Sequence, residues 1–213
     1  MKTLYPLSSF NKTELEGFEK CFCPVVRSYS RGEVIMRLDE ENNYVGVIAS
    51  GTAHLVTTTF DGTKTIIDYF EPGNIFGRRF SPCTQIDPYL VTAKTKCTVW
   101  LVEYERVITC CEKRCEKHIR LIDLMILTMA RRAQLHVEVL GKRSIRGKLM
   151  SYFSHISRSR ESRTFVLPLS LSDLADYISV DRSAMMREIK NLNNEKIIVS
   201  HANKVTILKD VNV

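Results

Sequence analysis

The first half of the chain alternates short runs of β-branched, aromatic and aliphatic residues with turn signals. The runs occupy residues 34–36, 44–49, 54–59, 65–70 and 98–102. Glycine marks the turns at Arg31-Gly32, Ser50-Gly51, Asp61-Gly62, Pro72-Gly73 and Phe76-Gly77. Short strands at this regular spacing predict a sandwich or barrel. Asp61-Gly62 predicts a hairpin, since both residues tolerate the positive φ that short hairpin turns need.

From Glu112 onward the pattern changes to that of a long helix. Seven residues at alternating spacings of three and four form a seam: Ile119, Ile122, Ile126, Met129, Ala133, His136 and Leu140. Such a seam is typical of a helix that pairs with another helix, so we expect a homodimer joined through residues 112–140. The alternative is a helix packed on its own β-domain, which would also use Leu121, Leu124 and Leu127.

The last third predicts two short helices joined by a turn. Ser170-Leu171-Ser172-Asp173 has the form of a capping box and opens a helix over residues 171–177, with Leu174 and Ala175 facing inward. Asp181 caps a second helix that runs to about residue 193, after a tight turn at Ile178-Ser179-Val180. The apolar stripe of this second helix is Met185, Ile189 and Leu192. Two helices joined in this way form a helix-turn-helix, whose second helix enters the major groove of DNA.

The face opposite that stripe is polar and basic. Its outward residues are Arg182, Ser183, Met186, Arg187 and Lys190. An arginine in this position can donate two hydrogen bonds to O6 and N7 of guanine, while Lys190 can meet a phosphate as a point charge. Residues 197–200 and 204–208 flank a polar turn and predict a two-stranded wing along the DNA backbone.

The charge of the chain is concentrated in the same region. The 213 residues carry 31 Lys+Arg and 24 Asp+Glu, a formal charge of +7. Residues 1–140 hold 18 basic and 17 acidic residues, a net +1, whereas residues 141–213 hold 13 and 7, a net +6. A basic balance favours an anionic partner such as nucleic acid, although a solvated surface would also produce it. The shift coincides with Gly141, where we place the domain boundary.

In this order, these features resemble the Crp/Fnr family of bacterial transcription regulators, over nearly all of the chain. The resemblance also includes Arg31-Gly32-Glu33 and the segment Ala93-Lys94-Thr95-x-Cys97-x-Val99. It implies an α+β fold with an N-terminal β-roll, a cupin-like jelly roll of the cyclic-nucleotide-binding type, as the effector domain. That domain and a dimerisation helix over about residues 112–140 make up residues 1–140. A winged helix-turn-helix DNA-binding domain occupies residues 141–213.

The resemblance implies partners and site residues as well. The expected partners are double-stranded DNA with a pseudo-palindromic operator, a second copy of the chain, RNA polymerase and a small-molecule effector. By position, Arg182, Ser183 and Arg187 match residues that read base edges and nearby backbone, and Ser170 and Ser172 match residues that touch phosphates. Ser183 replaces an acidic residue that commonly accepts from cytosine, so the usual operator preference of the family is not expected here.

The effector is not expected to be cyclic AMP. Relatives that sense it use Phe-Gly-Glu and a later Arg-Ser-Ala to hold the ribose and the phosphate. Here Phe76-Gly77 is followed by Arg78, and Asp87 or Pro88 stands in place of the phosphate arginine. A carboxylate repels a phosphate and proline has no cation to donate. Arg78 and Arg79 instead predict an effector pocket for an anionic ligand, with Phe76 and Gly77; the alternative is two solvated arginines.

Seven cysteines predict reduced thiols rather than a disulfide framework, because the number is odd and the chain can build its own core. Fnr-like relatives bind an iron–sulfur cluster, but the N-terminal C-x-x-C that they use is missing, so we expect no cofactor and no metal. A cluster, a thiol switch or a haem ligand is the alternative. His136 is expected to be packed or hydrogen-bonded rather than a metal ligand.

Three further expectations concern location and activity. Residues 1–23 lack the apolar core of a signal peptide, and no uncharged apolar span approaches about 18 residues, so we expect a cytoplasmic protein without a membrane partner. No nucleophile–base pair, P-loop or metal-spaced His/Glu pair is present, so we expect no enzyme. The second hypothesis is a ligand-binding signalling module whose basic C-terminal domain docks an acidic protein or a membrane surface.

Overall fold

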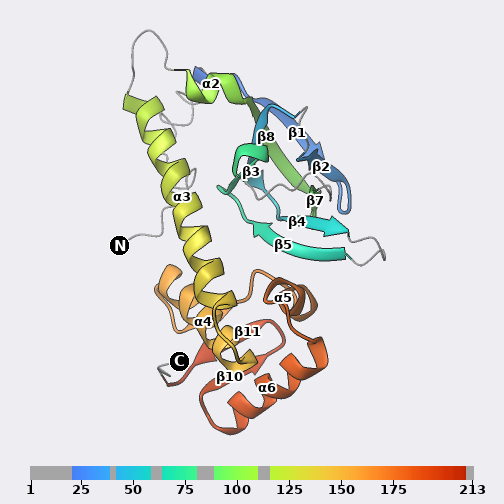
Figure 1. The fold of residues 1–213 in the computed structure, drawn as a ribbon, viewed down its shortest axis with the longest axis vertical. Helices are drawn as coiled ribbons and strands as arrows, with labels where there is room; N and C mark the ends of the chain where they lie inside the picture. The colour runs from blue at the N-terminus through green and yellow to red at the C-terminus, as the bar shows by residue number, and fades with distance from the viewer. Residues whose placement is uncertain (1–20, 39–41, 59–63, 81–88, 110–115, 210–213) are drawn as a thin grey trace. The chain divides into compact units, whose positions relative to one another are not determined.

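The chain forms two compact units, and the boundary between them lies between residues 130 and 131. The computed structural model describes residues 21–38, 42–58, 64–80, 89–109 and 116–209 (Figure 1). The division falls within helix α3 (Glu116–Leu140), which ends directly before Gly141. The domain boundary that the sequence placed at Gly141 stays a prediction.

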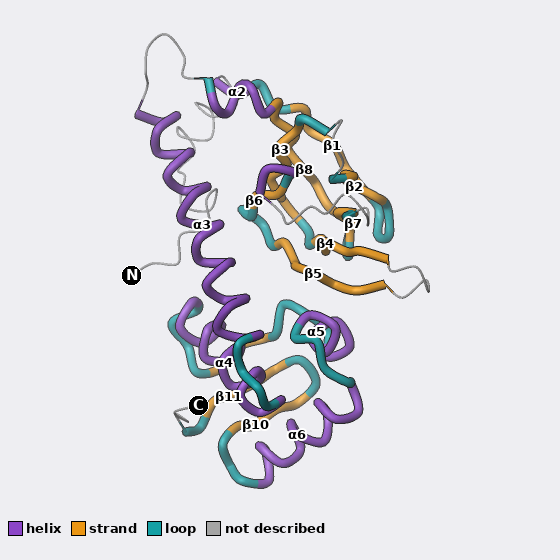
Figure 2. Tube along the Cα trace, viewed as in Figure 1, coloured by secondary structure: helices purple, strands orange, loops and turns teal. Residues whose placement is uncertain are grey.

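The N-terminal unit contains two four-stranded antiparallel sheets (Figure 2). One sheet has the order β1-β8-β3-β6, formed by β1 (Val25–Tyr29), β8 (Cys97–Glu103), β3 (Tyr44–Ser50) and β6 (Ile75–Phe76). The other has the order β2-β7-β4-β5, formed by β2 (Val34–Arg37), β7 (Leu90–Ala93), β4 (Ala53–Thr58) and β5 (Lys64–Phe70). The predicted all-β domain is therefore confirmed. The predicted turn at Asp61-Gly62 lies outside the described residues.

The main core of this unit lies between the two sheets. It combines residues such as Ile48 and Val99 of one sheet with Leu55 and Phe70 of the other. Strand β3 contributes side chains to this core and also to a second cluster on the other face of its sheet, because successive side chains of a strand point in opposite directions. Val45 and Val47 pack with α2 (Tyr104–Ile108) and with Met125 of α3 in a second cluster.

A close backbone approach fixes one corner of the core. Gly46 and Phe76 are paired across β3 and β6, and the Phe76 ring is fully buried. A Cβ added at Gly46 would lie 2.2 Å from that ring, so only glycine leaves room for it. The short 3-10 helix η1 (Arg78–Phe80) follows directly after Gly77.

The C-terminal unit contains the two helices, the turn and the hairpin that the sequence predicts for a winged helix-turn-helix. After the end of α3 come α4 (Ile145–Ser159), β9 (Thr164–Val166), α5 (Leu171–Tyr177) and α6 (Arg182–Asn194). Strands β10 (Ile198–His201) and β11 (Lys204–Ile207) pair antiparallel and form the predicted wing. Strand β9 extends this hairpin to a three-stranded sheet of order β10-β11-β9. The sequence reading had not predicted α4 or β9.

Side-chain caps start both helices of the motif where the sequence predicted them. The Ser170 hydroxyl accepts from the Asp173 N–H (3.2 Å) and donates to the Asp173 carboxylate (2.6 Å). Asp181 accepts from the Ala184 N–H at 2.8 Å. Between the helices, Ser179 has φ +54°, a left-handed conformation that disfavours residues with a Cβ.

Among the described residues, no helix is both long and apolar enough to cross a membrane.

Ser179→Gly is expected to stabilise the turn by about 0.5–1 kcal/mol, because glycine adopts a positive φ without the steric cost that serine carries. Amide hydrogen exchange of α5 and α6, followed by mass spectrometry, should show slower exchange in this variant. Ser183→Gly is the matched control: it places glycine inside α6 and should speed exchange. Faster exchange in Ser179→Gly would contradict this explanation of the turn.

Candidate functional site

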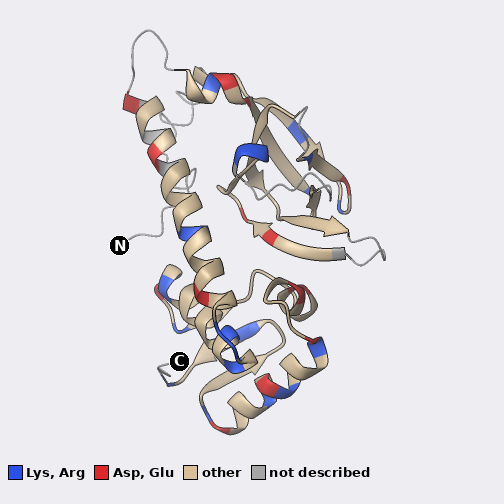
Figure 3. Ribbon diagram, viewed as in Figure 1, with Lys and Arg blue, Asp and Glu red and all other residues tan. Residues whose placement is uncertain are grey.

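Helix α6 buries one face and exposes the other. Met185, Ile189 and Leu192 are 0%, 6% and 0% exposed, as the predicted apolar stripe requires. The five residues predicted to face outward are all exposed: Arg182, Ser183, Met186, Arg187 and Lys190. The exposed face of α6 therefore carries Arg182, Arg187 and Lys190. Figure 3 shows basic and acidic residues along the ribbon of this helix.

The buried stripe packs on the rest of the C-terminal unit. α6 contacts α4, α5 and β10. Leu149 and Tyr152 of α4 and Leu174 of α5 are fully buried in the same unit. Removing apolar side chains from water is favourable, so the stripe determines which face of α6 is buried.

A polar contact holds the wing to the end of α6. The Asn193 side-chain amide donates to the Ile189 carbonyl (2.8 Å) and to the Ser200 hydroxyl (2.7 Å). Its carbonyl oxygen accepts from the Ser200 N–H at 2.8 Å. Asn193 thus connects α6 to β10, a role that the sequence reading missed. An amide at the end of a helix, before a short β-run, was the available signal.

The two serines at the start of α5 have different surroundings. Both are partly exposed. The hydroxyl of Ser170 already serves in the cap with Asp173, whereas Ser172 is the second residue of α5 and its side chain takes no part in that cap. The phosphate contacts expected of both serines stay a prediction.

The predicted seam of α3 is largely exposed in the single chain. Ile119, Ile126 and Leu140 are 51%, 58% and 46% exposed, and Met129 and Ala133 are exposed as well. Ile122 and His136 are partly exposed. The inward side of α3 is occupied by other residues: His118, Met125, Leu135 and Val139. An apolar stripe of this length on a helix is typical of a surface that another chain covers.

His136 packs against the helix-turn-helix. Its Nε2 lies 3.5 Å from the Tyr177 hydroxyl, and the two rings meet edge to face with centroids 5.3 Å apart. Both residues belong to the C-terminal unit. The expectation of a packed or hydrogen-bonded histidine agrees with this position.

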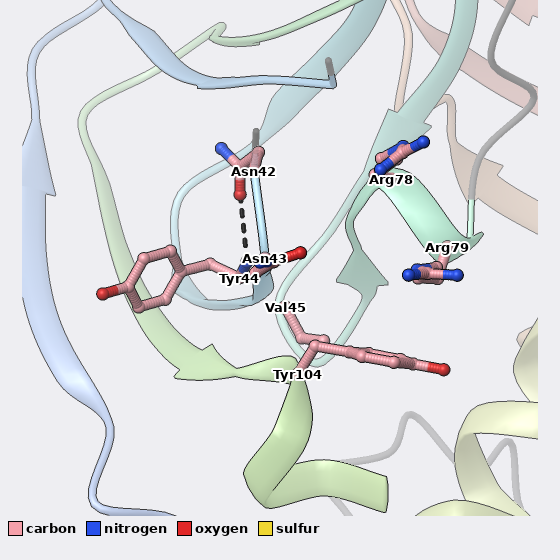
Figure 4. A pocket seen from close by; sticks show the side chains of 7 residues that line it. All are labelled: Asn42, Asn43, Tyr44, Val45, Arg78, Arg79 and Tyr104. Carbon is pink, nitrogen blue, oxygen red and sulfur yellow. Dashed lines mark hydrogen bonds between the residues drawn. The ribbon is translucent and has the colours of Figure 1, made fainter. Parts of the chain in front are cut away.

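The predicted effector residues separate into two pairs. Phe76 and Gly77 are buried, with Phe76 packed against Phe70 in the core. Arg78 and Arg79 instead line a shallow pocket with Tyr104 and with the segment 42–45 (Figure 4). Positions 87 and 88, where the sequence lacks the phosphate arginine, lie outside the described residues.

Polar and aromatic groups surround the two guanidinium groups in this pocket. The Arg79 guanidinium carbon lies 5.1 Å from the centroid of the Tyr104 ring, which gives the cation a π face to rest on. Asn42 accepts from the Tyr44 N–H at 3.0 Å and shapes the opposite wall (Figure 4). Tyr104 and the two asparagines were not predicted as pocket residues.

Cysteines and metal ligands offer no second site within the described part of the chain. Cys21 and Cys23 are exposed, while Cys97 is buried and donates to the Thr52 carbonyl at 3.0 Å. Burial raises the pKa of the Cys97 thiol, so it is not activated. No group of three or more His, Cys, Asp or Glu residues comes together there as for a metal. Cys83, Cys110, Cys111 and Cys115 lie outside the described residues.

The N-terminal domain matches a known domain family, and most of the chain aligns with known regulators. Residues 26–114 match the cyclic nucleotide-binding domain family. The chain is 26% identical to the transcriptional activator protein FnrL of Cereibacter sphaeroides, over 86% of this chain and 76% of that protein. It is 23% identical to the nitrogen fixation regulation protein FixK of Bradyrhizobium diazoefficiens, over 100% of this chain and 90% of that one.

The fold agrees with a solved relative. The structure of FixK2 from Bradyrhizobium japonicum matches with a TM-score of 0.65 at 22% identity, and the match covers 87% of this chain and 93% of that one. The resemblance inferred from the residues, the β-roll domain and the winged helix-turn-helix therefore agree with these comparisons. The chain is thus similar over most of its length to known transcriptional regulators, and the comparisons support a regulator of the Crp/Fnr type.

Proposed function

We propose that the chain is a homodimeric, sequence-specific DNA-binding regulator that inserts α6 into the major groove of a pseudo-palindromic operator. The observation that carries this proposal is the division of α6 into a buried apolar stripe and an exposed basic face. If the polar face of α6 served only to keep the unit soluble, its arginines would not need to lie on one exposed side directly after a short turn. DNA, RNA polymerase and a small-molecule effector are the proposed partners, and no catalytic activity is proposed.

The exposed face offers two kinds of contact. Arg187, one turn into α6, can donate two hydrogen bonds to O6 and N7 of guanine. Arg182 and Ser183 lie at the start of the helix and reach base edges or nearby backbone. Lys190 lies further along and can meet a phosphate. The exposed Lys204 on the wing can add a backbone contact, as can Ser172 at the start of α5.

The exposed seam of α3 supports the homodimer. Two α3 helices that pair through it would bury the apolar side chains that a single chain leaves exposed. A two-fold axis along this pair would carry two copies of α6 to half-sites about 34 Å apart, one turn of DNA. The names of FnrL and FixK, an activator and a regulation protein, support a role in transcription.

The pocket beside η1 supports an anionic effector. Arg78, Arg79, Asn42 and Asn43 line a shallow surface hollow next to Tyr104. A carboxylate or phosphate can accept from both kinds of donor. Since Arg78 stands where cyclic AMP sensors have an acidic residue, the proposed effector is not cyclic AMP held by the usual family chemistry. Its binding would shift the population between dimers that fit the operator spacing and dimers that do not.

Arg187→Ala is expected to weaken binding to the operator by about 1–3 kcal/mol, with a smaller effect on random DNA, because only the operator presents the paired base edge. Lys190→Ala, the matched control, should weaken both by similar amounts. Fluorescence anisotropy with an operator selected from genomic fragments, and with a shuffled duplex of equal length, measures both affinities. Equal losses on the two duplexes for Arg187→Ala would refute a base-reading role.

Ile126→Asp is expected to raise the dimer dissociation constant at least about 100-fold, because each copy loses an apolar contact and both charges are buried in the seam. Leu127→Asp is the control, since Leu127 is also exposed on α3 but lies off the seam. Sedimentation velocity over a concentration series measures the association. An unchanged constant for Ile126→Asp, or an equal loss for Leu127→Asp, would argue against the seam.

Arg78→Ala is expected to reduce ligand stabilisation of the N-terminal unit. In a thermal-shift screen of small carboxylates and organic phosphates, an effector should raise the unfolding midpoint of the wild-type chain, and this rise should shrink in Arg78→Ala. Arg27→Ala, at an exposed arginine on β1, is the control and should retain the rise. A ligand that stabilises the wild type and Arg78→Ala equally, or stabilisation by cyclic AMP, would contradict the proposed pocket.

A further inference from the structure

Helix α4 carries two cations toward the helix-turn-helix at its N-terminal end. Ser144 caps this helix by accepting from the Gly147 N–H at 3.0 Å, and Arg146 and Lys148 follow within the first turn. Both cations point to elements of the motif rather than into solvent alone. The start of α4 therefore provides polar contacts to α6 and to the turn before it.

Arg146 forms a fork between Glu188 of α6 and Glu195, the C-cap residue of that helix. Its Nε donates to Glu188 Oε1 at 2.5 Å, and its two terminal nitrogens donate to Glu195 at 2.8 and 2.6 Å. The side chains of Arg146 and Glu188 are only 35% and 19% exposed, so water screens this pair partially. The hydrogen bond from Arg146 lowers the pKa of Glu195. Short, charge-assisted, bidentate bonds of this kind fix geometry as well as distance.

The two glutamates lie on a third side of the helix and its C-cap, where Glu188 is partly buried and Glu195 is exposed. They are seven residues apart, which is about two helical turns, and so share one side of the helix. This side borders the stripe of Met185, Ile189 and Leu192 and lies away from Arg182 and Lys190. A stripe of apolar contacts allows a helix to roll, whereas directional bonds at one border resist that rotation.

Lys148 holds the turn that precedes α6. Its ammonium group donates to the carbonyl of Ile178 at 2.9 Å and to that of Ser179 at 3.4 Å. Ile178 is the C-cap of α5, where carbonyl groups have no partner within the helix. A cation at this end is favourable both as a donor and for the helix dipole. Thus α4 fixes α6 at its beginning through the turn, and along its length through Arg146.

We propose that Arg146 is a positioning residue for base recognition: it sets the rotation of α6 about its axis and thereby aims Arg187 at the base edge. This inference rests on the proposed DNA-reading function of α6. Lys148 supports it by fixing the turn. Two cations of the basic C-terminal region then serve contacts inside the unit, and Arg146 makes no phosphate contact.

The test compares specificity rather than affinity alone. Arg146→Gln should lower the ratio of operator to shuffled-duplex affinity about tenfold, the size expected for a lost contact between neighbouring residues. Arg143→Gln removes the same charge from an exposed position nearby and should leave the ratio unchanged. Arg146→Lys keeps the charge but loses the fork, so its affinity ratio should lie between those of Arg146→Gln and Arg143→Gln. The slope of log affinity against log salt should be the same in wild type and Arg146→Gln.

Further variants separate positioning from folding. Glu195→Gln weakens the Arg146–Glu195 contact by changing the acceptor, and it should also lower the ratio of operator to shuffled-duplex affinity. If Arg146→Gln does not fold, Glu195→Gln provides the test. An unchanged ratio in Arg146→Gln, or a salt slope lowered by about one as for a lost phosphate contact, would overturn the inference. Wild-type protein without sequence preference would instead refute the proposed function.

Discussion

The burial of three apolar side chains on α6 is the constraint on which the function of the C-terminal unit depends. When Met185, Ile189 and Leu192 are buried and α6 packs on α4 and α5, the opposite face of the helix is exposed to solvent. The arginines and the lysine of α6 lie on that face, so the same pattern that stabilises the unit also presents its candidate DNA contacts. Replacing a buried residue of the stripe by a polar one would therefore damage folding and recognition together.

Directional contacts supply what apolar burial leaves undetermined. Asn193 joins the end of α6 to the wing, and Lys148 holds the turn at its beginning. The fork of Arg146 adds a third contact along the side of the helix. Because α4 starts shortly after α3 ends, a change in the direction of α4 would be carried to α6 through these bonds. This gives the inferred effector response a physical route within the C-terminal unit.

The sequence was informative wherever a local pattern determined the structure. The capping residues Ser170 and Asp181 and the stripe of α6 were predicted from spacing alone, and the structure confirms them. Local rules suffice there, because a cap or a stripe depends on residues within a few positions. The all-β domain was also predicted, since glycine turns and β-prone runs alternate in it.

Contacts between distant residues could not be predicted in this way. Arg146 and Glu188 are 42 residues apart, and nothing in their local sequences marks them as partners. The pocket beside η1 brings Arg79 to Tyr104 only through the pairing of strands. Phe76 illustrates the opposite case: it was assigned to the pocket by analogy, but it packs in the core because Gly46 leaves room for its ring.

The central claim is that two copies of α6 read a two-fold symmetric DNA site. Selection of genomic fragments by the purified full-length chain, followed by sequencing, tests it most directly. The expected result is a strongly enriched motif with two inverted half-sites whose centres lie about one helical turn, or 34 Å, apart. Retention of fragments without a common motif, or of a motif without inverted symmetry, would contradict it.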